Sequence, residues 1–171
     1  PPNQTPTNSQ NGRALRYTRI EIDPEDGNRF WVASQTGLWR GTYDPGRLGQ
    51  PEAQRADWVR EFPTADTPAA WNLATSRSGD YWPSHATDLR VLPDPRDDER
   101  HEGRRRFLIL YLAVYGQGIY RGRFDRRENR TEWDRALAVS WPARFGRVLV
   151  DVCVHRPQNV FAVAADLGLA L

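Results

Sequence analysis

Aromatic and charged side chains gather between positions 64 and 83, in a segment without the alternation of a strand. The residues with the most chemistry to offer are Trp71, Arg77, Asp80, Tyr81 and Trp82. Aromatic rings stack on sugar rings or on peptide side chains, and an arginine and an aspartate supply hydrogen bonds beside them. Loops of this length in compact domains tend to carry function. The segment therefore predicts a binding surface, with the alternative that its aromatic rings fill the seam between neighbouring sheets.

Hydrolysis by acid–base chemistry needs two carboxylates with separated pKa values facing one pocket. The available carboxylates include Asp66, Asp80 and Asp88, but no spacing rule selects a pair among them. We therefore assign no catalytic residue, and we expect a binding protein rather than an enzyme. The histidines, at positions 85, 101 and 155, have no cysteine or carboxylate neighbours at the spacing of metal ligands. Neither a metal nor a cofactor is predicted.

Three further features have simple structural interpretations. From Asp97 to Arg106 eight of ten residues are charged, and their interleaved signs predict a solvated hairpin extension; a recognition finger for an acidic partner or phosphate is the alternative. Gly116-Gln117-Gly118 lies between two expected strands, where it predicts a hairpin turn. Cys153, the only cysteine, lies in an apolar strand and is expected to be a buried, inert thiol.

A pattern of strand, turn and strand occurs three times along the chain, in residues 17–44, 87–125 and 148–171. Residues 19–22 alternate between charged and apolar side chains, as in a strand with two unlike faces, whereas 107–114 is a continuous apolar run typical of a strand covered on both faces. Proline and glycine separate the strands. Residues 50–59 are the best candidate for a short helical turn. Repeated β-meanders of this size are typical of propeller blades.

The composition limits the classes of function. A length of 171 residues with 39% apolar side chains fits one globular domain. The 24 basic and 22 acidic residues leave a formal charge of +2, which gives no strong field for nucleic acid or a membrane surface. Every basic residue is an arginine. No run of eighteen apolar residues occurs, so no membrane span is expected.

The repeats resemble the Asp-box, or BNR-repeat, β-propellers, a group that includes sialidases, sortilin-type receptors, xyloglucan-cleaving hydrolases and photosystem assembly factors. The first repeat carries the resemblance in Ile22-Asp23-Pro24, Asn28, residues 31–33, residues 37–40, residues 42–46 and Trp58. The second repeat keeps Asp125 and the closing Trp133 but lacks the glycine of the box. The resemblance implies that Asp44 and Asp125 accept hydrogen bonds from their own turns, and that Trp58 and Trp133 pack beneath them.

The resemblance implies an all-β propeller segment of about two and a half antiparallel four-stranded blades. The blades are expected at about 15–63, 84–140 and, incomplete, 144–171, with a polar tail at 1–14 and a connecting loop at 64–83. A ring of four to eight blades needs more sheets than these, from the same chain or another. The expected function is a binding or scaffold module that recognises a protein or glycan partner through the loops, and the resemblance favours a location outside the cytoplasm. The alternative is a fragment of an Asp-box glycoside hydrolase with Asp80 or Asp88 lining its central channel.

Overall fold

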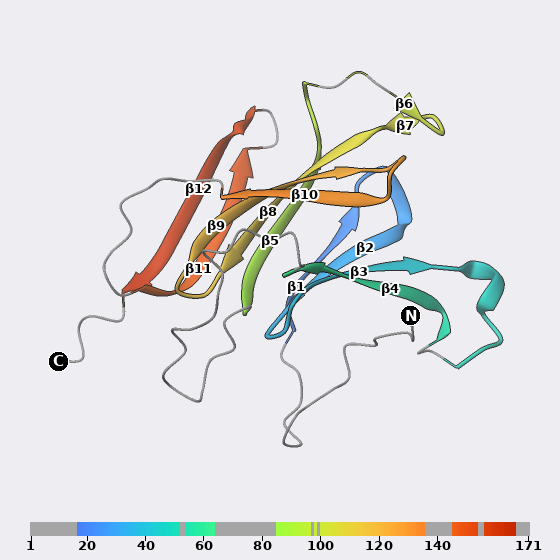
Figure 1. The fold of residues 1–171 in the computed structure, drawn as a ribbon, viewed down its shortest axis with the longest axis horizontal. Helices are drawn as coiled ribbons and strands as arrows, with labels where there is room; N and C mark the ends of the chain where they lie inside the picture. Colours follow the sequence, from blue (N-terminus) through green and yellow to red (C-terminus); the bar gives the residue numbers. More distant parts are fainter. Residues whose placement is uncertain are drawn as a thin grey trace.

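The computed structural model describes residues 17–51, 54–63, 85–96, 98, 100–135, 145–153 and 156–166. Within these ranges the chain is almost entirely antiparallel β-sheet, and its few helical residues are all in 3-10 conformation. The all-β class expected from the sequence is confirmed. Figure 1 shows three sheets side by side, with the second sheet between the first and the third.

The first sheet is a four-stranded meander in the order β1-β2-β3-β4. Its strands are β1 (Tyr17–Asp23), β2 (Asp26–Ser34), β3 (Gly37–Tyr43) and β4 (Ala56–Phe62). Gly37 begins β3 with φ +116°, and a Cβ there would lie 1.9 Å from the carbonyl oxygen of Phe62. Only glycine combines this conformation with so close a neighbour. The turn into β3 is therefore fixed by one residue of the sequence.

The second sheet repeats the meander, in the order β10-β9-β8-β5. Its strands are β5 (Ala86–Pro93), β8 (Phe107–Val114), β9 (Gly118–Asp125) and β10 (Arg130–Arg135). The turn at Gly116 and Gly118, both with positive φ, joins β8 to β9 as predicted. The charged insertion forms a small hairpin of β6 (Arg100–His101) and β7 (Arg104–Arg105), which confirms the expected hairpin.

The third sheet contains β11 (Phe145–Cys153) and β12 (Arg156–Asp166), paired antiparallel. One expectation from the sequence needs correction. Cys153, at the end of β11, is half-buried rather than buried. The short helical turn expected within 50–59 is present: Gln54 is in 3-10 conformation and its amide donates to the Pro51 carbonyl at 2.8 Å, just before β4 begins at Ala56. A further 3-10 turn, not predicted from the sequence, lies at Pro45–Arg47.

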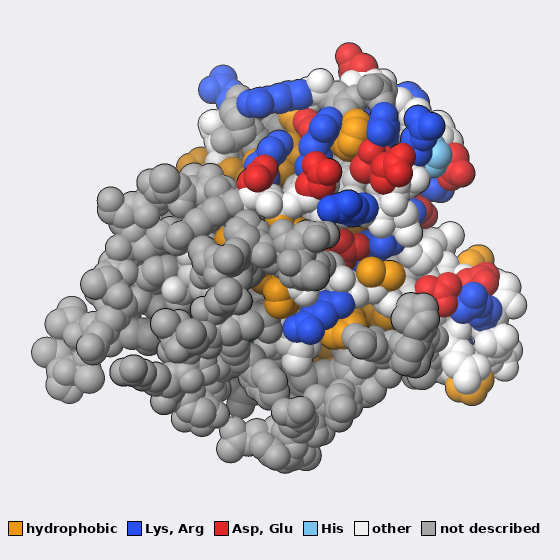
Figure 2. Space-filling view, viewed as in Figure 1, with side chains coloured by type: hydrophobic (Ala, Val, Ile, Leu, Met, Phe, Trp, Pro, Cys, Tyr) orange, Lys and Arg blue, Asp and Glu red, His pale blue; other side chains and the backbone are white. Residues whose placement is uncertain are grey.

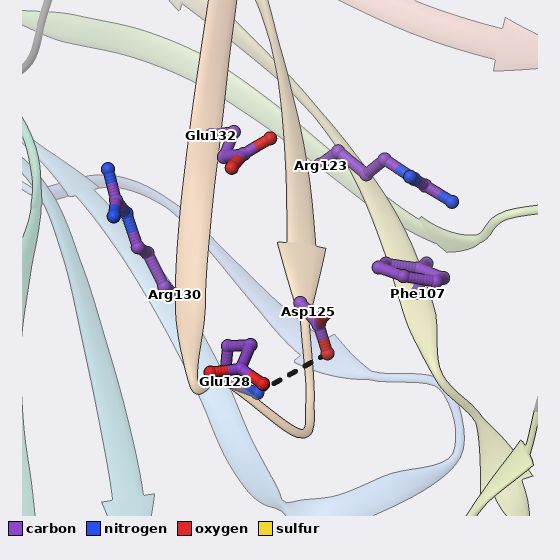
Figure 3. A pocket seen from close by; sticks show the side chains of 6 residues that line it. All are labelled: Phe107, Arg123, Asp125, Glu128, Arg130 and Glu132. Atoms are coloured by element: carbon purple, nitrogen blue, oxygen red, sulfur yellow. Dashed lines mark hydrogen bonds between the residues drawn. The ribbon is translucent and has the colours of Figure 1, made fainter.

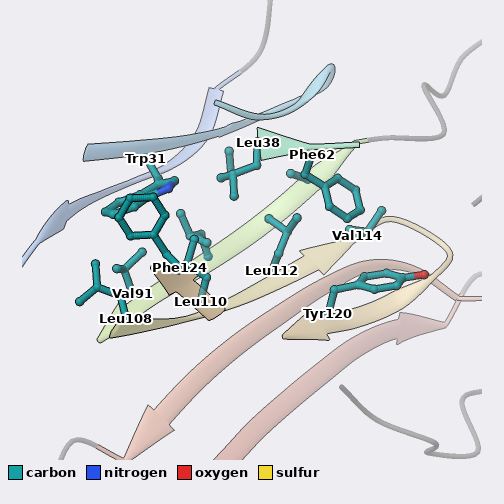
Figure 4. Packing of buried hydrophobic residues seen from close by; sticks show 13 residues of the cluster. Trp31, Leu38, Phe62, Val91, Leu108, Leu110, Leu112, Val114, Tyr120 and Phe124 are labelled. Atoms are coloured by element: carbon teal, nitrogen blue, oxygen red, sulfur yellow. The ribbon is translucent and has the colours of Figure 1, made fainter. Parts of the chain in front are cut away.

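The sheets pack face to face, and β8 contributes to both seams. Its even-numbered side chains face the first sheet and its odd-numbered ones face the third, which explains why the whole strand is apolar. Figure 4 shows the first seam, where Trp31, Leu38 and Phe62 of the first sheet meet the second sheet. Its second-sheet members include Val91, Leu108, Leu110, Leu112, Val114, Tyr120 and Phe124. In the second seam Ile109, Tyr111 and Ala113 pack against β11.

The first strands of the three sheets are joined by equivalent hydroxyl groups. Thr18 of β1 donates to the carbonyl of Ala86 in β5 at 2.7 Å, and Thr87 of β5 donates to the carbonyl of Val148 in β11 at 2.6 Å. Both hydroxyls also lie near a carbonyl of the next strand in their own sheet, at Ala33 and Ala113. The same hydroxyl-to-carbonyl contact thus joins the first sheet to the second and the second sheet to the third.

Buried ion pairs also cross or border the first seam. Arg126, after β9, binds Asp23 at the end of β1 through both terminal nitrogens, and both side chains are almost fully buried. Arg40 of β3 binds Glu61 of β4 and reaches across the seam to Asn129, whose side-chain oxygen accepts at 2.6 Å. Such pairs are stable in an interior only when their hydrogen bonds are well satisfied. Here they fix the outer parts of the two sheets against each other.

Candidate functional site

The segment with the predicted binding residues lies outside the part of the chain that the structure describes. Trp71, Arg77, Asp80, Tyr81 and Trp82 all fall in the undescribed range 64–84, and so does Asp66. The structure therefore brings none of them into a described site. The described candidate surface lies elsewhere, on strands β8, β9 and β10.

Asp44 and Asp125, the aspartates of the two expected Asp boxes, accept hydrogen bonds from the turns that follow them. The Gly46 amide donates to Oδ1 of Asp44 at 2.9 Å, and Nε of Arg47 lies 3.0 Å from its Oδ2. The amides of Arg127 and Glu128 donate to Oδ1 of Asp125 at 2.8 and 3.3 Å. Both carboxylates thus accept backbone hydrogen bonds two residues ahead, an Asx-type turn.

Asp125 is held ionised by these contacts. Burial acts to raise its pKa, but the hydrogen bonds from Arg106 and from the two turn amides outweigh it and hold the pKa below its usual value. Nη2 of Arg106 lies 2.7 Å from Oδ2. A carboxylate with a lowered pKa is a poor proton donor near neutral pH. Asp125 is therefore better suited to holding the turn than to acid catalysis.

The tryptophans Trp58 and Trp133 lie opposite glycines of the preceding strand. Trp58 pairs with Gly41, and Trp133 pairs with Gly122. A Cβ on Gly122 would lie 2.9 Å from the Trp133 ring, and one on Gly41 would lie 2.4 Å from the ring of Phe30, which Trp58 meets edge-on. In both sheets a glycine of the third strand makes room for an aromatic ring.

A cleft of about 350 Å³ opens on the outer half of the second sheet, beside the part that β11 and β12 cover. It is lined by Phe107, Arg123, Asp125, Glu128, Arg130 and Glu132 (Figure 3). The strand β10 supplies two of these residues because its side chains alternate: Arg130 and Glu132 are exposed, whereas Thr131 between them is buried toward the first sheet. A regular strand pattern therefore produces a charged outer wall.

The floor of the cleft is an aromatic ring under a guanidinium group. Cζ of Arg123 lies 3.6 Å from the centroid of the Phe107 ring, and Cζ of Arg106 lies 4.6 Å from the same centroid. Cation–π contacts of this kind fix the orientation of the guanidinium groups. Figure 2 shows arginine and acidic side chains interleaved over the region where β6, β7 and β10 lie in Figure 1. The surface offers both donors and acceptors, as a polar recognition site requires.

A second charged group lies along the first strands of the sheets. Arg90 of β5 donates to Glu21 of β1 at 3.3 Å and to Asp151 of β11 at 2.9 Å, so one side chain connects all three sheets. Its hydrogen bond holds the pKa of Asp151 below the usual value. Asp88, the carboxylate named for a hydrolase channel, is buried and accepts from the amides of Leu89 and Val150. Both its oxygens are used by the fold.

Sequence reasoning named Asp125 for its turn but did not find the cleft. Arg123, Arg130 and Glu132 are ordinary charged residues among 46 in the chain. The available signal was the alternation along β10, with two outward charges around a residue that faces a core. That alternation identifies an exposed face, but the concavity depends on where the third sheet ends.

Among the described residues no three histidine, cysteine, aspartate or glutamate side chains are grouped to hold a metal ion. In the same ranges the structure has no helix of the length and apolar character that crossing a bilayer demands. No protein-family model matches the sequence, and neither a curated protein nor a solved structure matches it.

Proposed function

We propose that this chain is a segment of a β-propeller of the Asp-box type and acts as a binding or scaffold module for a protein or glycan partner. The observation that carries the proposal is the repeated link between first strands, from Thr18 to Ala86 and again from Thr87 to Val148. In a propeller every blade meets the next by the same operation around a central axis. Two successive steps with the same hydroxyl-to-carbonyl contact are what such an operation produces.

Further features support the same architecture. Two four-stranded meanders each place an aspartate turn after the third strand, and a tryptophan of the fourth strand opposite a glycine of the third. Arg90 connects β1, β5 and β11, which are the strands that would surround a propeller axis. Because Leu89 and Val91 of the second sheet are covered by the first, neighbouring blades would be expected to stack through such apolar faces.

The binding role rests on the cleft beside β10. The cleft combines an aromatic ring, two arginines and three carboxylates. The strand β10 beside it pairs only with β9 among the described strands. Such a surface recognises polar groups of a partner at the outer rim of the module. Asp88 and Asp125 give the hydrolase alternative no support, because both are held by backbone amides.

The proposed function is tested by placing a photo-crosslinking amino acid at Glu132 in the full-length protein, in the cells that produce it. The matched control is Asp57, which stands one residue before Trp58 as Glu132 stands one residue before Trp133, but which does not line the cleft. We expect a discrete adduct from position 132 and none from position 57. The same pattern of adducts from both positions, or none from either, would contradict a binding role for the cleft. Turnover of fluorogenic glycosides by the purified protein would instead favour the hydrolase.

A further inference from the structure

A second pocket, of about 250 Å³, lies where the hairpin β6–β7 meets the first sheet and the turn between β9 and β10. Its donor side chains are Arg29, Thr42, His101, Arg104, Arg126 and Asn129. They come from three parts of the sequence that are brought together only by the packing of the two sheets. The pocket is separate from the cleft beside β10, because the two share no lining residue.

Two hydrogen bonds from the hairpin to acidic residues of the first sheet and its turn hold the hairpin in place. Nη1 of Arg104 lies 3.2 Å from Oδ2 of Asp26, and the Arg105 amide donates to Glu25 at 2.7 Å. The insertion is therefore not only a solvated extension: it forms one wall of the pocket. This arrangement keeps the guanidinium of Arg104, which is 39% exposed, in place at the opening.

Arg29 makes only long ion pairs to its acidic neighbours. Its terminal nitrogens lie 3.6 Å from Asp23 and 3.9 Å from Asp26, beyond good hydrogen-bond distance, and its guanidinium stands 5.2 Å above the ring of Phe124. Its Nε is buried without a hydrogen-bond partner. A buried donor without a partner is costly, and such groups in native proteins call for an explanation. A ligand in the pocket would give this arginine a closer anionic partner.

Neutral donors complete the wall opposite the hairpin. The side-chain oxygen of Asn129 accepts from Arg40, so the amide group has its nitrogen left to donate. Asn129 has φ +54°, and its carbonyl also accepts from Arg40 at 3.2 Å, so both its backbone and its side chain are positioned. The hydroxyl of Thr42 adds a donor that rotates to suit its partner.

One lining residue, Glu102, carries a negative charge. It lies at the tip of the hairpin with 74% of its side chain exposed, so it can remain in water when the pocket is filled. The nearby Asp23 and Asp26 are already paired with arginines. The donors of Arg126 are used by Asp23 and the Arg105 carbonyl, so Arg29, Thr42, Arg104 and Asn129 face the pocket with donors that an oxyanion would satisfy better than a cation.

We propose that this pocket binds the phosphate group of a small phosphomonoester or free phosphate. Guanidinium groups bind phosphate oxygens through paired hydrogen bonds, and Arg29 and Arg104 supply such groups on two sides. Thr42 and Asn129 donate to the remaining oxygens. The volume exceeds what a bare phosphate needs and leaves room for a small organic group on the fourth oxygen.

Isothermal titration of the full chain with inorganic phosphate and with glycerol 3-phosphate tests the proposal, at about 0.15 M salt to screen the exposed arginines. We expect saturable binding at one site, weakened at least about tenfold by Arg104→Gln and by Thr42→Val. Arg127→Gln, a change to a 67% exposed arginine of the neighbouring turn that does not line the pocket, should leave the affinity unchanged.

Each outcome of the titration either supports or contradicts the proposed phosphate site. Absence of saturable binding would contradict the proposed phosphate site. Equal losses of phosphate affinity in Arg104→Gln and Arg127→Gln would also contradict it, because they would indicate only a general attraction of phosphate to arginines. If Arg104→Gln lowers the melting temperature without ligand, Thr42→Val provides the independent variant, since it removes no charge. Tighter binding of glycerol 3-phosphate than of inorganic phosphate would identify an ester as the ligand, and the reverse order would identify the free ion; both results uphold the pocket.

Discussion

At the scale of single residues, arginine makes sets of buried hydrogen bonds in this protein that lysine could not make. Arg126 and Arg40 are almost completely buried, and each makes several directed hydrogen bonds to one carboxylate and to backbone or amide oxygens. A planar guanidinium with five donors can satisfy such a set, whereas an ammonium group has three donors and a stronger hydration. The absence of lysine from the sequence is consistent with this use of charge inside the fold.

The pair of Asp23 and Arg126 gives the first stability prediction. Asp23→Asn keeps the shape of the side chain but removes the carboxylate that binds Arg126 directly, leaving this buried charge with only Glu25 at 3.6 Å, which costs about 3–5 kcal/mol of unfolding free energy. Asp57→Asn is the control, because Asp57 pairs with Arg47 on the surface and should cost less than about 1 kcal/mol. Urea unfolding of both variants measures the difference. Similar losses in the two would mean that the buried pair contributes no more than a surface pair.

At the scale of elements, the two tryptophans of the fourth strands are not equivalent in their packing. Trp133 packs on the core of the first seam, meets Phe62 edge-on at 5.3 Å and donates from Nε1 to the carbonyl of Glu61 at 3.0 Å. Trp58 is half-buried like Trp133, but it lies outside this cluster and its ring meets that of Phe30 edge-on. We expect Trp133→Ala to cost about 3–5 kcal/mol, and Trp58→Ala to cost about half as much. Thermal and urea unfolding of the two variants would contradict this ranking if Trp58→Ala were the more damaging.

Strands and turns were predictable from the sequence because their signals are local. The apolar run of β8, the glycines around Gln117 and the charged hairpin each follow from residues within ten positions. The partners of Arg126 and Arg40 were not predictable, since 24 arginines look alike in the sequence and the chosen carboxylate depends on how sheets stack. The pockets depend on the same stacking. The helical turn within 50–59 was predicted, but the 3-10 turn at Pro45–Arg47 was missed because Asp44 and Pro45 were assigned only to the Asp box.

At the scale of the whole molecule, the equivalent contacts of Thr18 and Thr87 show which residues of β1 correspond to which residues of β5. Ile20 and Ile22 of β1 follow Thr18 as Leu89 and Val91 of β5 follow Thr87. Leu89 and Val91 are buried by the first sheet, whereas Ile20 and Ile22 are 60% and 59% exposed. Adjacent apolar side chains that remain exposed on a sheet face are typical of a surface that another layer covers. In the proposed propeller that layer would be a further blade.

This correspondence leads to a prediction that separates the two strands. Leu89→Ala should cost about 2–5 kcal/mol, because it opens a cavity in a filled seam, whereas Ile20→Ala should change the stability of the isolated chain by no more than about 0.5 kcal/mol. Ile20→Thr with Ile22→Thr should in addition reduce the binding of a hydrophobic dye and the light scattering of concentrated samples, since it removes exposed apolar surface. Equal destabilisation by Leu89→Ala and Ile20→Ala would mean that the first sheet is already covered on both faces, and a further blade could then not stack there as the second sheet stacks on the first.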